Sequence, residues 1–280
     1  MNHERVWYKV IMIEELNRLN PIELTNKKST PWWLLLNILA LDAPIVALVW
    51  QNFFSKTFNV EISFTEKAVL FFTVWLIYLL DHFLDSRKGI HRTQRHLFAS
   101  RNPKITLLLI SLTFGASILL SFTLSKRLII GGMILAIVIC IYLIVVHSNL
   151  TDLIIKKNCK ELLVGIGFGT GVALPVITSD LSITTWLPSV TLFCLICWAN
   201  CKLIENWESD NMRFSKTDIL LIMFLFCCMF FSKNYFVIAS IISMTSFLMI
   251  NNFVASKNIQ LSRVLADVSL LSPLVFANYT

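Results

Sequence analysis

The chain has 280 residues, of which 56% are hydrophobic and only 15% are charged, and its mean hydropathy is +0.71. This composition excludes a water-soluble globular protein, whose exterior must face water. The net charge of +7 does not indicate nucleic-acid binding, because the basic residues lie in the connections between apolar segments. That distribution follows the positive-inside rule and suits contact with anionic membrane lipids.

Nine apolar segments are long enough, or nearly so, to cross a hydrocarbon core of about 30 Å. Their length and the absence of strict alternation favour helices over a barrel. The predicted fold is all-α, a polytopic membrane helical bundle with about nine transmembrane helices. Residues 1–31 are predicted to be a cytoplasmic N-terminal segment, and residues 32–280 the membrane domain. The predicted helices span 32–53, 67–84, 105–124, 128–147, 161–178, 186–204, 218–232, 235–251 and 262–277.

The distribution of Lys and Arg predicts the orientation of this bundle. If the N-terminus is inside, the inner connections hold 18 of these residues and the outer connections hold 5. This excess predicts a cytoplasmic N-terminus in a multi-pass protein of the cell (cytoplasmic) membrane. The acidic clusters at the ends of the second and sixth helices then lie on the cytoplasmic side.

The second predicted helix ends in an acidic pair, Asp81 and Asp85. Four-residue spacing places both carboxylates on one helix face, one turn apart. Carboxylates near hydrocarbon are costly and are usually functional. Paired oxygen ligands suit Mg²⁺, which completes its coordination with water and substrate phosphate. The basic residues Arg92 and Arg95 follow and could bind that phosphate.

The fifth predicted helix carries glycines at every second position, Gly165, Gly167, Gly169 and Gly171. Such glycines allow the close approach of another helix or of a ligand, and helix packing is the favoured interpretation.

The sixth predicted helix is followed by a second acidic cluster, Glu205, Asn206, Glu208 and Asp210, with Lys216 a little further on. Acidic residues for a metal ion and basic residues for phosphate therefore occur twice. A solvated loop surface is the competing interpretation of this second cluster.

Other polar residues lie in or near the apolar segments. Asp42 in the first helix and Asp267 in the ninth could line a cavity or pair with neighbouring side chains. Asn200 precedes Glu208 by two turns, and Tyr78 precedes Asp81 by about one turn. Asn200 is a candidate to line the same cavity as Glu208, and Tyr78 could position a substrate or simply pack against its neighbours.

These features resemble the UbiA superfamily of membrane prenyltransferases, which has nine transmembrane helices and acidic motifs at the ends of helices two and six. Asp81-x-x-x-Asp85 is similar to the second half of the first motif, and Asn206–Asp210 is similar to the second. His91–Arg95 is similar to the Arg-Thr loop that follows the first motif. Lys216–Thr217 falls where the family has Lys-Ser.

The chain departs from the family pattern at four positions, one of which is His96, where the Arg-Thr loop usually has Pro. Ile77 and Tyr78 stand where the first motif has Asn-Asp, and Asn206 replaces the first Asp of the second motif. The chain therefore resembles a divergent member.

The resemblance implies Mg²⁺-dependent transfer of an isoprenoid group from a prenyl diphosphate to an acceptor, often aromatic, with the tail held inside the bundle. It implies catalytic roles for Asp81, Asp85 and Asp210. It implies one metal ion held by Asp81 and Asp85 and a second held by Glu205, Asn206, Glu208 and Asp210. The residues implied to bind substrate are Arg92, Arg95, Lys216, Asn200 and Tyr78.

Three alternatives remain. A non-catalytic UbiA-like protein could bind isoprenoid lipid without transferring it. A transporter is disfavoured, because the acidic residues cluster at one face and no inverted repeat is apparent. A CDP-alcohol phosphotransferase is disfavoured, because the chain lacks the signature sequence of that class. Neither the acceptor, the prenyl chain length nor the oligomeric state follows from the sequence.

Overall fold

The structure is a computed structural model that describes residues 32–87, 94–147, 160–208, 216–255 and 258–276. The chain divides into two compact units, one ending at Leu35 and the other beginning at Leu36. The described part of the first unit is a short 3₁₀ helix, η2 (Trp32–Leu34). Within the described ranges there are helices and no strand, which confirms the all-α prediction for that part of the chain.

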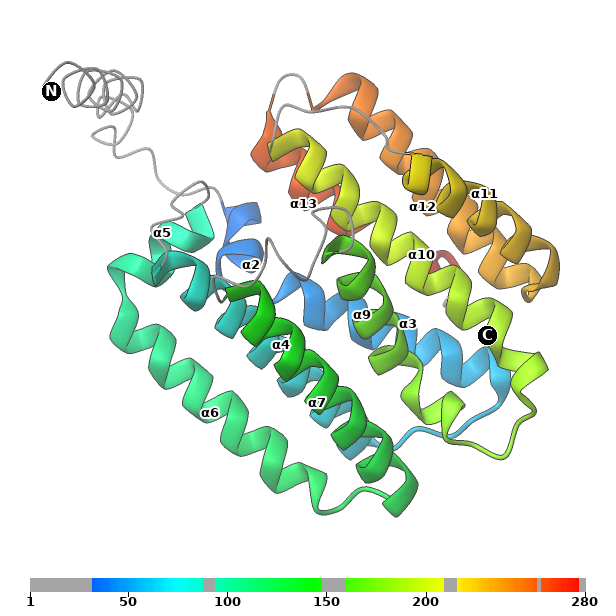
Figure 1. Cartoon of the computed structure of the whole chain (residues 1–280), viewed down its shortest axis with the longest axis horizontal. Helices are drawn as coiled ribbons and strands as arrows, with labels where there is room; N and C mark the ends of the chain where they lie inside the picture. Colours follow the sequence, from blue (N-terminus) through cyan, green and yellow to red (C-terminus); the bar gives the residue numbers. More distant parts are fainter. Residues whose placement is uncertain (1–31, 88–93, 148–159, 209–215, 256–257, 277–280) are drawn as a thin grey trace, which may run out of the picture. The chain divides into compact units, whose positions relative to one another are not determined.

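The second unit is a set of helices lying side by side (Figure 1). They are α2 (Leu35–Ile38, which begins at the boundary between the units), α3 (Asp42–Phe58), α4 (Phe64–Arg87), α5 (Gln94–Arg101), α6 (Pro103–Ser121), α7 (Lys126–His147), α9 (Lys160–Ile177), α10 (Ile183–Glu208), α11 (Lys216–Phe231), α12 (Asn234–Phe253), α13 (Ile259–Ser269) and η4 (Ser272–Phe276).

Seven helices in the described residues are long and apolar enough to cross a membrane: α4, α6, α7, α9, α10, α12 and the continuous segment Ile259–Phe276. They indicate a multi-pass integral membrane protein. Each of the nine predicted segments overlaps a helix, but α3 has 17 residues and α11 has 16, both below the length of the other seven. A count of nine crossings therefore stays a prediction.

The predicted first helix, 32–53, is wrong in its N-terminal half, because the chain breaks before Asp42. In a continuous helix the ring of Pro44 would collide with the carbonyl of Ala40. Ala40 instead has a positive φ of 55°. The Asp42 carboxylate accepts hydrogen bonds from Asn37 Nδ2 at 2.7 Å and from the Ala43 amide at 2.9 Å. Asp42 is the first residue of α3, so these bonds lie where the helix begins, although its N-cap residue, Leu41, makes no side-chain capping bond.

Helix α10 is the centre of the unit, and most of its residues from 189 to 200 are buried. It packs most closely against α9. A Cβ atom built on Gly165 would lie 2.7 Å from the Trp198 amide nitrogen, and one on Gly169 would lie 2.5 Å from Cys194 Sγ. These two glycines, four residues apart, therefore let the helices touch. The packing interpretation of the glycines is confirmed at both positions.

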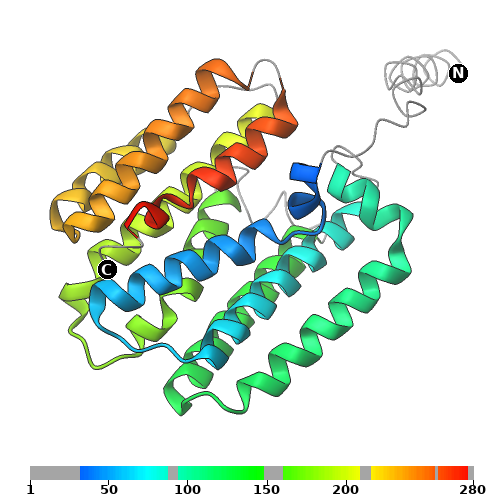
Figure 2. The ribbon, with the colours of Figure 1, turned by 180° about the vertical axis from the view of Figure 1, so that it is seen from behind.

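An aromatic cluster joins α3 to α10, α12 and the C-terminal helices. Trp50 stacks on Phe193 with ring centroids 4.1 Å apart, and Phe236 packs against both Trp50 and Phe54. The Trp50 indole donates a hydrogen bond of 2.6 Å to the carbonyl of Leu270. Helix α3 lies in front of this assembly in Figure 2 and behind it in Figure 1.

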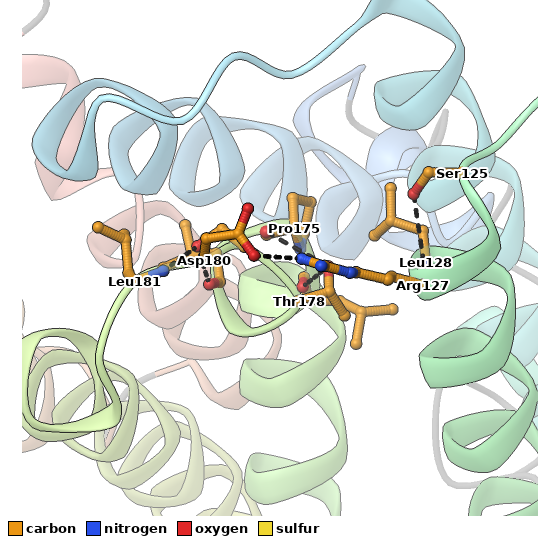
Figure 3. A network of polar contacts seen from close by, with 10 residues as sticks. Ser125, Arg127, Leu128, Pro175, Thr178, Asp180 and Leu181 are labelled. Carbon is orange, nitrogen blue, oxygen red and sulfur yellow. Dashed lines mark hydrogen bonds and ion pairs between the residues drawn. The ribbon is translucent and has the colours of Figure 1, made fainter.

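Helices α6 and α7 expose apolar side chains in the manner of lipid-facing helices. Leu119 of α6 is 70% exposed and Ile144 of α7 is 67% exposed. A soluble protein rarely exposes such a continuous apolar surface. In Figure 3 an ion pair between Arg127 and Asp180 connects the start of α7 to the turn after α9. Both side chains are largely exposed, so the pair contributes little stability.

Candidate functional site

Six helix termini meet at one end of the unit. The C-terminal ends of α4 and α7 are linked through Asp85 and His147, and the ends of α10 and α13 through Glu208 and Arg263. Glu161, at the start of α9, interacts with Glu205 of α10. The charge of Arg95, at the start of α5, acts both on Asp81 and on Asp267. The acidic residues predicted on two separate helices therefore belong to one region.

Asp81 and Asp85 lie on the same helix, as their spacing predicts, and the structure adds His147 to them. His147 Nε2 lies 3.2 Å from Asp85 Oδ1 and 3.7 Å from Asp81 Oδ1. One ligand atom from each of the three residues lies within 4.8 Å of the other two. This is the group in the described residues with the composition and spacing of a metal site.

The acidic residues of α10 are helical and have cationic neighbours. Glu205 and Glu208 lie in the last turns of α10 with side chains only 28% and 26% exposed, so the solvated-loop interpretation is wrong for these two residues. Asn206 between them is 4% exposed. Glu205 lies 3.8 Å from Lys202, and Glu208 lies 3.0 Å from Arg263. In the part of the chain that the structure describes, these residues therefore form charge pairs rather than a second metal cluster. A second metal stays a prediction, because Asp210 lies outside the described residues.

Several buried donors at this end lack a hydrogen-bond partner. They are Nε of Arg95, Nε and Nη2 of Arg263, and Nδ2 of Asn206. Leaving such groups unpaired is costly, particularly on a charged side chain. An anion with several oxygen acceptors would satisfy them. The charge of Arg95 also acts on Arg263, so both guanidinium groups belong to this end of the unit.

A cavity of about 30 Å³ lies deeper in the unit. It has room for a water molecule or one small polar group and is far smaller than a drug-sized ligand pocket. Tyr78, Asn200 and Asp267 are polar lining residues of this cavity, as predicted for Asn200. Its lining residues are Ala43, Val46, Tyr78, Val164, Phe168, Cys197, Asn200, Cys201, Asp267 and Leu270.

Three of the predicted site residues have no described side chain. Arg92 and Asp210 lie outside the described residues, and Lys216 is described only as the first residue of α11. Their proposed contacts with phosphate and metal stay predictions.

The structure places at this end four residues that the sequence analysis did not select: His147, Glu161, Lys202 and Arg263. A signal existed for two of them, because His147 and Glu161 lie at the predicted inner ends of their helices. Lys202 and Arg263 resembled ordinary positive-inside residues.

Comparison of the chain with protein-family models, with curated proteins and with solved structures gives no match. The functional argument therefore depends on the chemistry of this site.

Proposed function

We propose that the protein is a membrane prenyltransferase that moves an isoprenoid group from a prenyl diphosphate to an acceptor, with a divalent cation. The observation that carries the proposal is that a possible metal site and a set of buried cationic donors lie at the same end of the helical unit. Asp81, Asp85 and His147 can hold a metal ion, and Arg95 and Arg263 offer buried donors without partners. A metal-bound diphosphate needs both.

The carboxylates of Asp81 and Asp85 fit Mg²⁺, which binds one or two carboxylates and substrate phosphate. When bound, the ion neutralises charge that develops on the departing diphosphate. Arg95 and Arg263 would hold the diphosphate oxygens by charge-assisted hydrogen bonds. The allylic C–O bond then breaks with its electron pair leaving on the diphosphate. The acceptor forms a bond to the same carbon and loses a proton.

The residues around the inner cavity suit a position beside it for the reacting carbon of the prenyl group. Tyr78 and Phe168 are among its lining residues, and aromatic rings can stabilise nearby cations. The cavity itself cannot contain a prenyl tail. Helix α4 packs mainly against α3 and α6 and less closely against α7 and α9. We therefore place entry of the tail along the α4–α9 seam, which must widen when the tail binds.

The test uses full-length protein in detergent with Mg²⁺ or Mn²⁺, labelled geranylgeranyl diphosphate and a panel of aromatic acceptors. We expect acceptor-dependent release of diphosphate, reduced about 100-fold or more in Asp81→Asn and Asp85→Asn. Asp180→Asn is the matched control, since it removes an acidic group at the other end of α9.

Two outcomes would contradict the proposal. Diphosphate binding without release under every acceptor would favour the isoprenoid-lipid-binding alternative. Absence of binding together with ion flux in liposomes would favour a transporter.

A further inference from the structure

The orientation of His147 gives the metal-binding group a chemical preference. Its ring lies at the end of α7, and its side chain is only 8% exposed. Nδ1 lies 3.0 Å from the carbonyl oxygen of Leu143. A carbonyl only accepts hydrogen bonds, so Nδ1 carries the hydrogen in that contact. Nε2 is then the ring nitrogen that faces Asp81 and Asp85.

Positive charge is needed between Nε2 and the two carboxylates, and it can be a ring proton that gives an ion pair with Asp85 or a metal ion in its place. Nε2 is buried, and its contacts with the two carboxylate oxygens lack hydrogen-bond geometry. Metal-binding histidines commonly donate their other ring N–H to a backbone carbonyl, which fixes the tautomer and the ring. The Leu143 contact is of this kind.

The separations also fit a shared metal ion. Nitrogen and oxygen ligands about 2.0–2.2 Å from a metal lie about 3.0–3.5 Å from one another in tetrahedral or octahedral geometry. The distance from Nε2 to Asp85 is 3.2 Å, and the distance to Asp81 is 3.7 Å. A movement of a few tenths of an ångström would bring Asp81 into range.

We propose that Asp81, Asp85 and His147 form a site for a first-row transition-metal dication (Mn²⁺, Fe²⁺, Co²⁺ or Zn²⁺) and bind it more tightly than Mg²⁺. Imidazole suits such ions, whereas Mg²⁺ prefers oxygen ligands. Three protein ligands leave positions open for water or for oxygens of an anion. The inference rests on the proposed function only for the identity of that anion, a diphosphate.

The experiment measures metal binding directly in the full-length protein, freed of metal by a chelator and held in detergent. Co²⁺ is titrated by visible absorption, and Mn²⁺ by electron paramagnetic resonance, with Mg²⁺ as competitor. We expect His147→Asn to lower Mn²⁺ and Co²⁺ affinity about 10–100-fold and to change Mg²⁺ affinity by no more than about threefold. Asp180→Asn should bind like the wild type.

A measurement on the unmodified protein guards against a folding defect in the variant. Pulsed resonance of bound Mn²⁺ should detect an imidazole nitrogen coupled to the metal. Absence of that coupling, or Mg²⁺ displacing Mn²⁺ at equal concentration, would overturn the inference.

The two proposals fail separately. Prenyl transfer by the wild type, together with Mn²⁺ and Co²⁺ affinities that His147→Asn leaves unchanged, would retain the prenyltransferase and reject the transition-metal site. Tight Co²⁺ binding through His147, with no prenyl diphosphate bound or cleaved, would retain the metal site and reject the prenyltransferase.

Discussion

Asp267 is a carboxylate in the interior of a membrane protein, and Asn200 donates a hydrogen bond to it. Asn200 Nδ2 donates to Asp267 Oδ1 at 3.0 Å, and both side chains line the inner cavity. The cationic charges that act on Asp267 come from Arg95 and Arg263. A buried acid is tolerated only with such partners. Asn200 therefore has a structural task in addition to any contact with substrate.

Asn200→Leu should destabilise the protein, because it leaves Asp267 without its amide donor. We expect a loss of about 1–3 kcal/mol in the free energy of unfolding. The double variant, Asn200→Leu with Asp267→Leu, should lose less free energy of unfolding than the sum of the losses in the two single variants. Unfolding in detergent, followed by circular dichroism, gives all three values. Simple additivity would mean that the two side chains are not coupled.

The position of a residue within its helix could be predicted, but its partner on another helix could not. The spacing of Asp81 and Asp85 fixes their common face because an α-helix has 3.6 residues per turn. His147 is 62 positions beyond Asp85, and Asp267 is 67 beyond Asn200. Which face of α7 or α13 turns inward depends on packing, and the nearly uniform apolar character of α7 hides that face from the sequence.

At the scale of an element, hydropathy located the helices better than it located their ends. The apolar run 32–53 continues through the residues at which the helix breaks, so only Pro44 and Asp42 could have revealed the start of α3. In α10 the predicted end at residue 204 falls before Glu208, because the last turn is polar yet helical. Charge pairs with Lys202 and Arg263 hold that turn within the unit.

The α9–α10 contact predicts that alanine substitution has different effects on stability at Gly165 and at Gly167. Gly165→Ala would place a methyl group 2.7 Å from a backbone nitrogen of α10, which no rotamer change can relieve. We expect a loss of about 1–3 kcal/mol in the free energy of unfolding. Gly167→Ala is the matched control, because its nearest neighbour, a side-chain atom of Ile139, lies 3.9 Å away.

Gly167→Ala should leave stability unchanged or raise it slightly, since alanine favours a helix more than glycine does. Thermal unfolding of both variants in the same detergent provides the comparison. An equal loss of stability in both variants would show that these glycines matter through backbone freedom instead of close packing.

For the whole molecule, the two ends of the unit differ in chemistry. The end that contains Asp81, Asp85 and Arg263 is dense in charge, whereas the far end has the exposed pair Arg127 and Asp180. Positive charge in the sequence is biased in the same direction. A metal and an anion would therefore bind at the face that the positive-inside rule predicts to be cytoplasmic.

Whether the short helix α11 crosses the membrane determines the orientation of every helix that follows it. It follows the charged end of α10, and the amide of Lys233, just after α11, contacts Ser189 near the start of α10 at 3.4 Å. Helix α11 therefore returns to the far end of the unit although it has only 16 residues. At 1.5 Å per residue its length is about 24 Å, so flanking residues or local bilayer thinning must complete a crossing.

Cysteine labelling should show that α11 crosses the membrane. In a background without the seven native cysteines, single cysteines would replace the exposed residues Thr123, Asn234 and Gln260. An impermeant maleimide added to intact cells should label positions 123 and 234, and should label position 260 only after permeabilisation. Labelling of 123 and 260 but not 234 would mean that α11 stays on the cytoplasmic side, because every later helix would then be reversed. That outcome would remove one crossing from the predicted nine and would separate the N-terminal end of α13, with Arg263, from Asp81 and Asp85.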